Sequence, residues 1–330
     1  MAVAIAVRIV YPVLDMATTI PVVDLRDLSL PASDERRAAF VQTLGDGLST
    51  LGFVAVLGHG VFPELLERVY ASARETFALP VEIKAKYEAP DIGRQRGYTP
   101  MGLERAKDQS VADLKEFWMV GRPGDPTLPA NRFPTQTPAF GAALSDYFVA
   151  VERAGLELLG AVGEYLELPA TYFAEMVGGG NSVVRVLNYP DSEGPVPAGA
   201  VRAAAHEDIN VITLLPASTR PGLELLDRDG SWVAVETPPG VLIVDTGDMM
   251  ELVTAGRLSA VTHRVVNPEG SDGGRMSLPF FMHPRPDYVL TPIVDGYAEP
   301  IAAHDFLMNR LRENGVACPR GQKKPGQSQG

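Results

Sequence analysis

The stretch AAAHEDINVITLL, residues 203–215, decides the fold. It places His206 and Asp208 one residue apart, directly before a run of apolar and β-branched side chains that is typical of a strand. Because side chains alternate faces along a strand, positions i and i+2 project to the same side, so one imidazole and one carboxylate are expected to converge. So short a pattern also arises by chance, and a lone histidine on a strand is more often structural than a ligand. The rest of the chain has to distinguish these interpretations.

Short β-rich runs broken by turn residues surround this stretch. Seven of them follow one another: VVRVLNY (183–189), VITLLP (211–216), GLELLD (222–227), SWVAVE (231–236), VLIVD (241–245), AVTHRVV (260–266) and RMSLPFFM (275–282). Asp229-Gly230 predicts a hairpin between two of them, and Pro238-Pro239-Gly240 predicts a turn. So many short strands in succession are typical of a β-sandwich or jelly roll.

The preceding half of the chain shows helical spacing of its apolar residues. We expect a helix over 34–51, with Ser33 as its N-cap and Gly52 at its end, and a second helix that ends before Pro80. A third helix over 136–166 should pack its apolar stripe across the outside of a sheet. The expected fold class is therefore α+β or mainly β, with a helical N-terminal half that supports a β core and folds with it as one unit.

The two ends of the chain differ from the region between them. Residues 1–15, MAVAIAVRIVYPVLD, are apolar but interrupted by Arg8 and Pro12, which leaves no run long enough for a membrane span and no clear secretory signal. We expect these residues to be a non-structural extension. The other expected regions are a helical region over 16–165, a jelly-roll core over 166–311 and a polar, disordered tail over 312–330.

Composition excludes several classes of partner. The formal net charge is −12, and acidic and basic residues are interspersed, so no cationic surface is available to neutralise nucleic-acid phosphates. The single cysteine, Cys318, precludes an intramolecular disulfide framework and fits a reducing compartment. We therefore expect a cytoplasmic monomer that binds neither nucleic acid nor a membrane.

A second histidine completes a metal-binding set. The chain has five histidines, and His263 in AVTHRVV lies on a later predicted strand, which a jelly roll can bring beside His206 and Asp208. Two histidines and one carboxylate form the facial triad of non-haem iron(II) oxygenases, which leaves the other positions of the metal open. The sequence therefore predicts a mononuclear iron site.

Arg275 and Ser277 add a second feature. They are two residues apart on a predicted strand and so share a face. A buried guanidinium needs an anionic partner, and its planar fork of donors matches a carboxylate. The alternative to a bound ligand is an internal ion pair between Arg275 and an aspartate of the chain.

These features resemble a known family, the isopenicillin N synthase-like branch of the 2-oxoglutarate/iron(II) oxygenases. The likeness covers nearly the whole chain from Ile20 to about Leu311, and several motifs occur in the family's order. They are IPVVDL (20–25), LGFVAVLGHGV (51–61), DLKEFWMVGR (113–122), RVLNYP (185–190), HEDINVITLL (206–215), PPGVLIVDTGDMMELVTAGRLSAVTHRV (238–265) and RMSLPFF (275–281). The resemblance implies a double-stranded β-helix, or jelly-roll, core.

The resemblance also implies roles for six residues. These are the iron ligands His206, Asp208 and His263, the pair Arg275 and Ser277 that grips the distal carboxylate of 2-oxoglutarate, and Tyr189, which adds a hydrogen bond to a bound carboxylate. The implied activity is a dioxygenase that needs Fe(II), with 2-oxoglutarate and O2 as cosubstrates. It would oxidise, typically hydroxylate, a small molecule and release succinate and CO2.

Two other functions stay open on the sequence alone. One is an oxidase of the isopenicillin N synthase type that does not use 2-oxoglutarate, in which Arg275 and Ser277 hold a carboxylate of the substrate. The other is a jelly-roll binding protein without catalysis, against which the intact triad argues.

Several further residues are expected to be structural or to line the substrate site. Glu207 should point away from the metal because strand side chains alternate, and Asp245 and Asp248 in VDTGD are expected in a turn. The histidines outside the triad, His59, His283 and His304, are expected to be structural. The candidates to face the substrate are Tyr98, Phe117, Met250 and Phe281.

Overall fold

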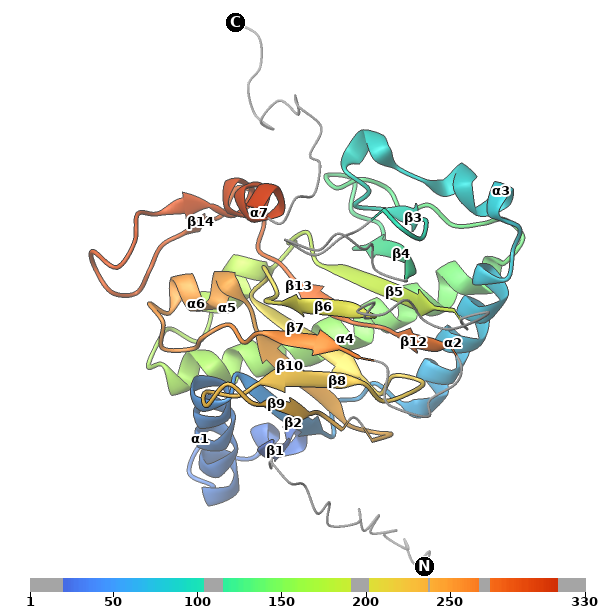
Figure 1. Ribbon diagram of the computed structural model, residues 1–330. Helices are drawn as coiled ribbons and strands as arrows, with labels where there is room; N and C mark the ends of the chain where they lie inside the picture. Colours follow the sequence, from blue (N-terminus) through green and yellow to red (C-terminus); the bar gives the residue numbers. More distant parts are fainter. Residues whose placement is uncertain (1–19, 104–114, 191–201, 237, 267–273, 314–330) are drawn as a thin grey trace, which may run out of the picture.

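The computed structural model describes residues 20–103, 115–190, 202–236, 238–266 and 274–313. The expectations for residues 1–15 and for the tail after Glu313 lie outside these ranges. Within the described residues, two β-sheets face each other, and the long helices cover the outside of the larger sheet (Figure 1). The predicted jelly-roll core with a helical N-terminal half is therefore confirmed.

The larger sheet has nine strands within the described residues. Their order is β1 (Val22–Asp24), β2 (Phe53–Leu57), β10 (Leu242–Thr246), β7 (Ile212–Pro216), β13 (Phe280–Met282), β5 (Val183–Tyr189), β4 (Glu116–Gly121) and β3 (Gly97–Thr99), with β12 (Arg275–Ser277) also paired to β5. All neighbours are antiparallel except β1 and β2. Because β12 and β13 both pair with β5, residues 275–282 form one edge of the site on this sheet.

The smaller sheet lies in front of the larger one in Figure 1. Its order is β6 (Ala203–His206), β11 (His263–Val265), β8 (Leu223–Leu226) and β9 (Trp232–Ala234). The predicted Asp229-Gly230 hairpin joins β8 to β9, and Gly230 has a φ of 86°, which a residue without Cβ adopts without strain. A separate two-stranded sheet consists of β14 (Val289–Leu290) and β15 (Ile301–Ala302).

The three long helices of the N-terminal half form where the sequence predicts them. They are α1 (Glu35–Thr50), α2 (Pro63–Phe77) and α4 (Pro138–Tyr165). The N-cap of α1 is Asp34 and not Ser33, because the Asp34 carboxylate accepts a hydrogen bond of 2.9 Å from the backbone N of Arg36. The packing of α4 on the outer face of the sheet is visible in its edge-to-face ring pair, Phe148 with Phe280, whose centroids are 5.1 Å apart.

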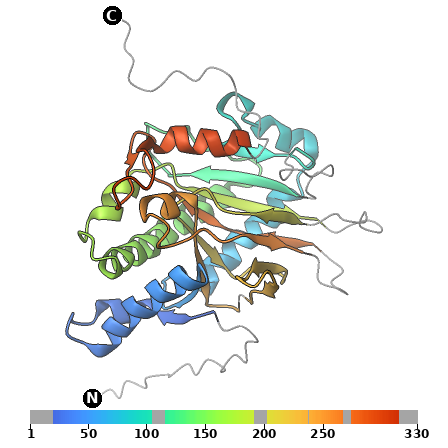
Figure 2. The same ribbon diagram turned by 60° about the vertical axis from the view of Figure 1, so that its left-hand side comes forward.

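The remaining helical segments are short. They are α3 (Val81–Lys84), α5 (Tyr172–Val177), α6 (Asp248–Val253), α7 (Ala303–Glu313) and the 3-10 turns Leu25–Ser29, Ala85–Tyr87 and Pro90–Ile92. Figure 2 shows α7, in red, above the sheets. The last two residues of this helix fall within the expected tail.

Alternation along the strands of the larger sheet separates two environments. Val184, Val186 and their equivalents on neighbouring strands face the helices and belong to one large apolar core. The residues between them face the smaller sheet, where Phe53 and Ile243 join a second, smaller core. Near β5 this inner face carries polar side chains instead, and these residues line the site described next.

The N-terminal half is less purely helical than expected. Four strands of the larger sheet, β1 to β4, come from it, and β1, β3 and the longest of them, β4, were not predicted. The reason is visible in EFWMVG, which is an apolar run without alternation. Such a run fits a strand that is buried on both faces, but short-range periodicity cannot distinguish it from a helical segment.

Candidate active site

Three polar side chains converge between the two sheets. His206 is the last residue of β6, His263 is the first residue of β11, and Asp208 follows in the loop after β6. Asp208 Oδ1 lies 3.7 Å from Nε2 of His206 and 3.9 Å from Nε2 of His263. One atom of each side chain lies within 4.8 Å of the others, which is a separation that one metal ion can bridge.

Backbone carbonyls fix the orientation of both imidazoles. Nδ1 of His206 lies 2.8 Å from the carbonyl oxygen of Ala204, and Nδ1 of His263 lies 3.1 Å from that of Val261. A carbonyl oxygen only accepts, so each Nδ1 carries the hydrogen and donates it. The lone pair of each neutral ring is then on Nε2, the atom that faces Asp208. The donor set is therefore two imidazole nitrogens and one carboxylate oxygen, which is the set that suits Fe(II).

Desolvation and neighbouring charges shift the pKa values of the two histidines in opposite directions. Partial desolvation, with repulsion from His263, lowers the pKa of His206, although 41% of its side chain is exposed to solvent. For His263, burial opposes protonation, but the carboxylates of Asp208 and Asp245 outweigh it and raise the pKa. At neutral pH, His206 is therefore the neutral ligand of the pair, and a bound cation would compete with a proton at His263.

Asp208 reaches the site from a loop and not from a strand. We expected strand alternation to align it with His206, and this reason is wrong because β6 ends at His206. The loop is held instead by Thr213, whose hydroxyl donates to Asp208 Oδ2, and by the backbone N of Asp248, which donates to the Asp208 carbonyl at 2.8 Å. Gly247 permits this approach, since a Cβ there would lie 2.7 Å from the same carbonyl oxygen.

Arg275 lies in the same cavity with the features of an anion-binding group. Its side chain is 1% exposed, and Nε donates to the carbonyl of Arg220 at 3.0 Å. Nη1 is buried without a hydrogen-bond partner, and no acidic side chain of the described residues pairs with the guanidinium. An unsatisfied buried charge is costly, so the internal ion pair considered above does not account for this residue, whereas a bound carboxylate would.

Ser277 and Tyr189 complete this end of the cavity. Arg275 is the register partner of Tyr189 across β12 and β5, and its guanidinium carbon lies 5.5 Å from the centroid of the Tyr189 ring. Ser277 is buried and lines the cavity two residues along the same face of β12. The fold therefore brings all six predicted site residues to one cavity, of about 80 Å³.

Comparisons with known proteins agree with this geometry. Residues 20–139 match the family model of the non-haem dioxygenase N-terminal region, described as that of morphine synthesis, and residues 181–284 match the 2OG-Fe(II) oxygenase superfamily. A proline hydroxylase from Petromyces alliaceus is 32% identical over 76% of this chain and 83% of its own length. Flavanone 3-dioxygenase 2 from Oryza sativa is 32% identical over 85% of this chain and 79% of its own length.

The chain belongs to the 2OG-Fe(II) oxygenase superfamily. Solved structures agree. A 2OG-Fe(II) oxygenase family protein from Caulobacter crescentus is 38% identical with a TM-score of 0.79, over 90% of this chain and 99% of that one. A full-length Neurospora crassa protein in complex with alpha-KG, which is 2-oxoglutarate, is 25% identical with a TM-score of 0.79, over 89% and 96%. This oxygenase is therefore a dioxygenase that depends on Fe(II) and 2-oxoglutarate and oxidises a small molecule.

Asp245 is a residue of the oxygenase site that the sequence analysis misplaced. It lies in β10 and not in a turn, opposite Thr213 of β7, and it is 5% exposed in the cavity. Burial, with repulsion from Asp208, raises the pKa of Asp245 to about 8. The signal was present in the predicted strand VLIVD, whose alternation places position 245 on the same inner face as Ile243.

The neighbouring acidic residues are held away from the triad. Glu207 accepts a hydrogen bond of 3.1 Å from Thr262, and its other oxygen lies 3.8 Å from Arg310 of α7. Asp248 begins α6, where a turn was expected, and accepts a hydrogen bond of 2.7 Å from Arg310. Arg310 therefore links α7 to the segment between two triad residues.

The other histidines have the structural environments that we expected. His59 is buried and lies 3.1 Å from the carbonyl of Gly240, while its Nδ1 accepts from the backbone N of Val61. His283 follows β13, and burial lowers its pKa to about 4. His304 is the second residue of α7. Within the described residues, none of the three belongs to the converging group.

Of the four candidates to face the substrate, Phe281 lines the cavity. Tyr98 is buried against Trp118, and its hydroxyl donates to Glu116 at 2.6 Å. Met250 is fully buried in the large core. Phe117 packs with Leu187 and Tyr189, which line the cavity, but is not among the lining residues itself.

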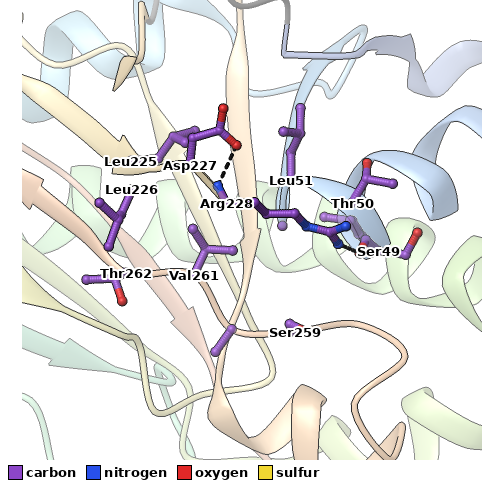
Figure 3. Close-up of a pocket in the computed structure, with 13 residues that line it drawn as sticks. Ser49, Thr50, Leu51, Leu225, Leu226, Asp227, Arg228, Ser259, Val261 and Thr262 are labelled. Atoms are coloured by element: carbon purple, nitrogen blue, oxygen red, sulfur yellow. Dashed lines mark hydrogen bonds between the residues drawn. The ribbon is translucent and has the colours of Figure 1, made fainter. Parts of the chain in front are cut away.

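A larger cavity of about 210 Å³ lies elsewhere (Figure 3). It is lined by the end of α1, the end of β8 and the segment 259–262, and none of the six predicted site residues faces it. Its charged residues are Asp227 and Arg228, and Arg228 donates to the carbonyl of Ser49 at 2.9 Å. Size therefore does not identify the active site of this oxygenase, whereas the converging polar groups do.

No helix among the described residues combines the length and the apolar character that crossing a bilayer requires.

Proposed function

We propose that His206, Asp208 and His263 bind the Fe(II) of this dioxygenase. The observation that carries the proposal is the close approach of three donor atoms, Nε2, Oδ1 and Nε2, with both Nδ1 atoms engaged by carbonyls. An arrangement that is fixed by the backbone loses little conformational entropy on binding the metal. The iron, when bound, supplies the oxidative chemistry with O2.

We propose that Arg275, Ser277 and Tyr189 bind 2-oxoglutarate. The distal carboxylate would satisfy the buried Nη1 of Arg275, and the Ser277 hydroxyl lies on the same strand face to donate a further hydrogen bond. Tyr189, beside Arg275, is placed to contact the same ligand. The keto acid end would then extend toward the triad, because the triad and Arg275 line one cavity.

The chain's own residues would serve orientation and exclusion of water. The apolar wall residues Leu187, Leu215 and Val265 line the same cavity and keep its interior poor in water. Thr213 orients Asp208 through its hydroxyl. Charged contacts in such a site are stronger than in bulk water, which favours tight binding of a dicarboxylate beside the metal.

The biological setting is inferred from composition. We infer a cytoplasmic monomer that acts on a free small molecule and not on nucleic acid or at a membrane. The net charge of −12 supports the exclusion of nucleic acid, and the single cysteine supports a reducing compartment. The two relatives named above are a proline hydroxylase and a flavanone dioxygenase, so their substrates differ too much for transfer to this chain.

Anaerobic titration of the purified protein with Fe(II) and 2-oxoglutarate tests this assignment. A visible charge-transfer band of the chelate should appear with one equivalent of each in the wild type. It should be absent in Asp208→Ala, which lacks a metal ligand, and require more 2-oxoglutarate in Ser277→Ala. A full band in Asp208→Ala would contradict the ligand assignment.

A further inference from the structure

Arg185 lies on the same strand face as the proposed 2-oxoglutarate site but at its other end. On β5, Arg185, Leu187 and Tyr189 alternate toward the cavity, and all three line it. Tyr189 of β5 is the register partner of Arg275 of β12. Arg185 lies further along β5, where its backbone N donates to the carbonyl of Pro279, the residue between β12 and β13, at 3.0 Å. Four residues of strand separate the two ends, which is about 13 Å. One ligand carboxylate at Arg275 therefore does not occupy Arg185.

The Arg185 end of the cavity is the end near the triad. Phe281 on β13 is the register partner of Thr213 on β7, and Thr213 donates to Asp208. Phe281 also pairs with Val183 on β5, next to Arg185. The pairing of Val183, Phe281 and Thr213 across β5, β13 and β7 therefore places Arg185 at the end of the cavity that is near Asp208. A molecule to be oxidised has to lie at this end, close to the metal.

Two aromatic rings hold the Arg185 guanidinium. Its central carbon lies 4.6 Å from the ring centroid of Phe117 and 5.6 Å from that of Phe281. Stacking on ring faces orients a guanidinium and leaves its N–H groups directed outward in the plane. Arg185 also interacts with other residues, but a guanidinium has five N–H donors, so such contacts are compatible with a ligand.

Two other cations line the cavity, and of these Arg275 lies at the opposite end, beside Tyr189. Arg185, Lys115 and Arg275 are the lysine and arginine residues among those that line it. Lys115 precedes β4, which pairs with β5 on the edge away from β12, so β5 separates Lys115 from Arg275, and the charge of Lys115 acts on His206. Among these three lining cations, Arg185 is the one that stacks on Phe281, so an apolar ring and a guanidinium lie side by side there.

We infer that Arg185 binds a carboxylate of the substrate that is oxidised, with Phe281 packed against the apolar part of the same molecule. The substrate class is then a small organic acid with an apolar body. The inference rests on the proposed function, because it takes the Arg275 end of the cavity as the 2-oxoglutarate site. A carboxylate is favoured over a neutral oxygen because a charge-assisted bidentate pair is about twice as strong as a neutral hydrogen bond.

The test compares acids with their uncharged amides in the protein loaded with Fe(II) and 2-oxoglutarate. Phenylacetate, 3-phenylpropanoate and 4-phenylbutanoate, each with its primary amide, are titrated anaerobically while the charge-transfer band is followed. Succinate formation is then measured in air. At least one acid should shift the band and stimulate succinate formation, with an affinity at least tenfold higher than that of its amide.

Substitutions of Arg185 test whether this residue causes the preference for an acid over its amide. Arg185→Gln should reduce the preference of the acid over its amide to less than threefold, and Arg185→Lys should retain part of it. Because each preference is a ratio within one protein, partial misfolding does not imitate the result. Arg285→Gln is the matched control, since Arg285 lies 5.8 Å from the ring of Tyr288, outside the cavity, and should keep the wild-type ratio.

The outcomes that overturn this inference differ from the outcome that contradicts the proposed function. Equal affinity for acids and amides, an unchanged preference in Arg185→Gln, or no binding of any acid at about 10 mM would overturn the inference. These results are read only after the wild type has formed the 2-oxoglutarate band. Absence of that band would instead contradict the proposed function.

Discussion

His263 of β11 is the register partner of His206 of β6, and the centroids of the two imidazole rings are 4.5 Å apart. The β6–β11 pairing therefore determines the distance between two proposed ligands, and Asp208 only has to reach them from the adjoining loop. Burial of apolar cores on both sides of the larger sheet holds this frame without help from a metal. The site should be largely formed before iron binds.

We predict that Asp208→Ala and His263→Ala each abolish stoichiometric iron binding with little change in fold. A facial triad has no spare ligand, so loss of one member removes most of the affinity. Metal analysis after anaerobic loading measures the first effect, and thermal unfolding measured by circular dichroism measures the second. His304→Ala, on α7, is the control and should bind one iron. Tight binding of one iron by either site variant would be incompatible with the assignment.

Gly247→Ala should weaken iron binding by about tenfold to a hundredfold, the range for residues that orient metal ligands. A Cβ at this position would lie 2.4 Å from the Asn210 carbonyl oxygen and 2.7 Å from that of Asp208, so the Asp208 loop has to move. Iron titration followed by the chelate band measures the effect.

Gly160→Ala in α4 is the matched control for this glycine. A Cβ there meets nothing within 4 Å, so the substitution should leave iron affinity unchanged and increase stability by up to about 1 kcal/mol through helix propensity. If both variants bound iron like the wild type, the close approach at Gly247 would not be what positions Asp208.

Local sequence signals define some strands of this oxygenase completely and others only in part. The strand VVRVLNY was predicted with the bounds that the structure has, because apolar residues and turn signals define it. RMSLPFFM was predicted as one strand but divides into β12 and β13, since Pro279 has no N–H to continue the ladder with β5.

Long-range packing accounts for what the sequence did not reveal. The role of Gly247 depends on a contact with a loop 37 to 39 residues earlier in the chain, which local patterns do not encode. Arg185 belongs to the predicted strand, but its place beside Phe117 and Phe281 requires the register of three strands. The triad could be proposed early because His206, Asp208 and His263 lie in motifs that resemble those of the family and occur in the family's order.

The free energy of unfolding should depend on pH between about 6.5 and 4 through the lowered pKa of His283. Burial lowers its pKa to about 4, and its Nδ1 is buried without a hydrogen-bond partner within the described residues. Between pH 6.5 and pH 4 the unfolded chain therefore binds a proton at this position that the folded chain does not. By linkage, the free energy of unfolding then falls as pH decreases through this window, by about 2 to 3 kcal/mol for this residue.

Replacement of His283 by Gln should remove this contribution. Urea unfolding of the metal-free protein at pH 7 and at pH 4.5 measures it, and the variant should lose less stability between the two than the wild type, by about 2 kcal/mol. Identical losses in the two proteins would mean that His283 takes up its proton in the folded state by pH 4.5, so that its pKa is not lowered.

Arg275→Gln should weaken the affinity for 2-oxoglutarate while iron binding stays nearly unchanged. The substitution removes a bidentate, charge-assisted pair from a side chain that is 1% exposed, at a cost of roughly 2–5 kcal/mol. This corresponds to a loss of affinity on the order of thirtyfold to several thousandfold. Succinate formation without added substrate should decrease in parallel when 2-oxoglutarate is below saturation.

Two further variants make the Arg275 result specific. Ser277→Ala removes a single neutral hydrogen bond and should weaken 2-oxoglutarate binding by only about fivefold, which corresponds to roughly 1 kcal/mol. Arg285→Gln removes an arginine outside the cavity and should have no effect. If Arg275→Gln bound 2-oxoglutarate within about threefold of the wild type, the buried guanidinium would have another partner. Its most direct alternative role would then be to hold a carboxylate of the substrate, as in an oxidase of the isopenicillin N synthase type.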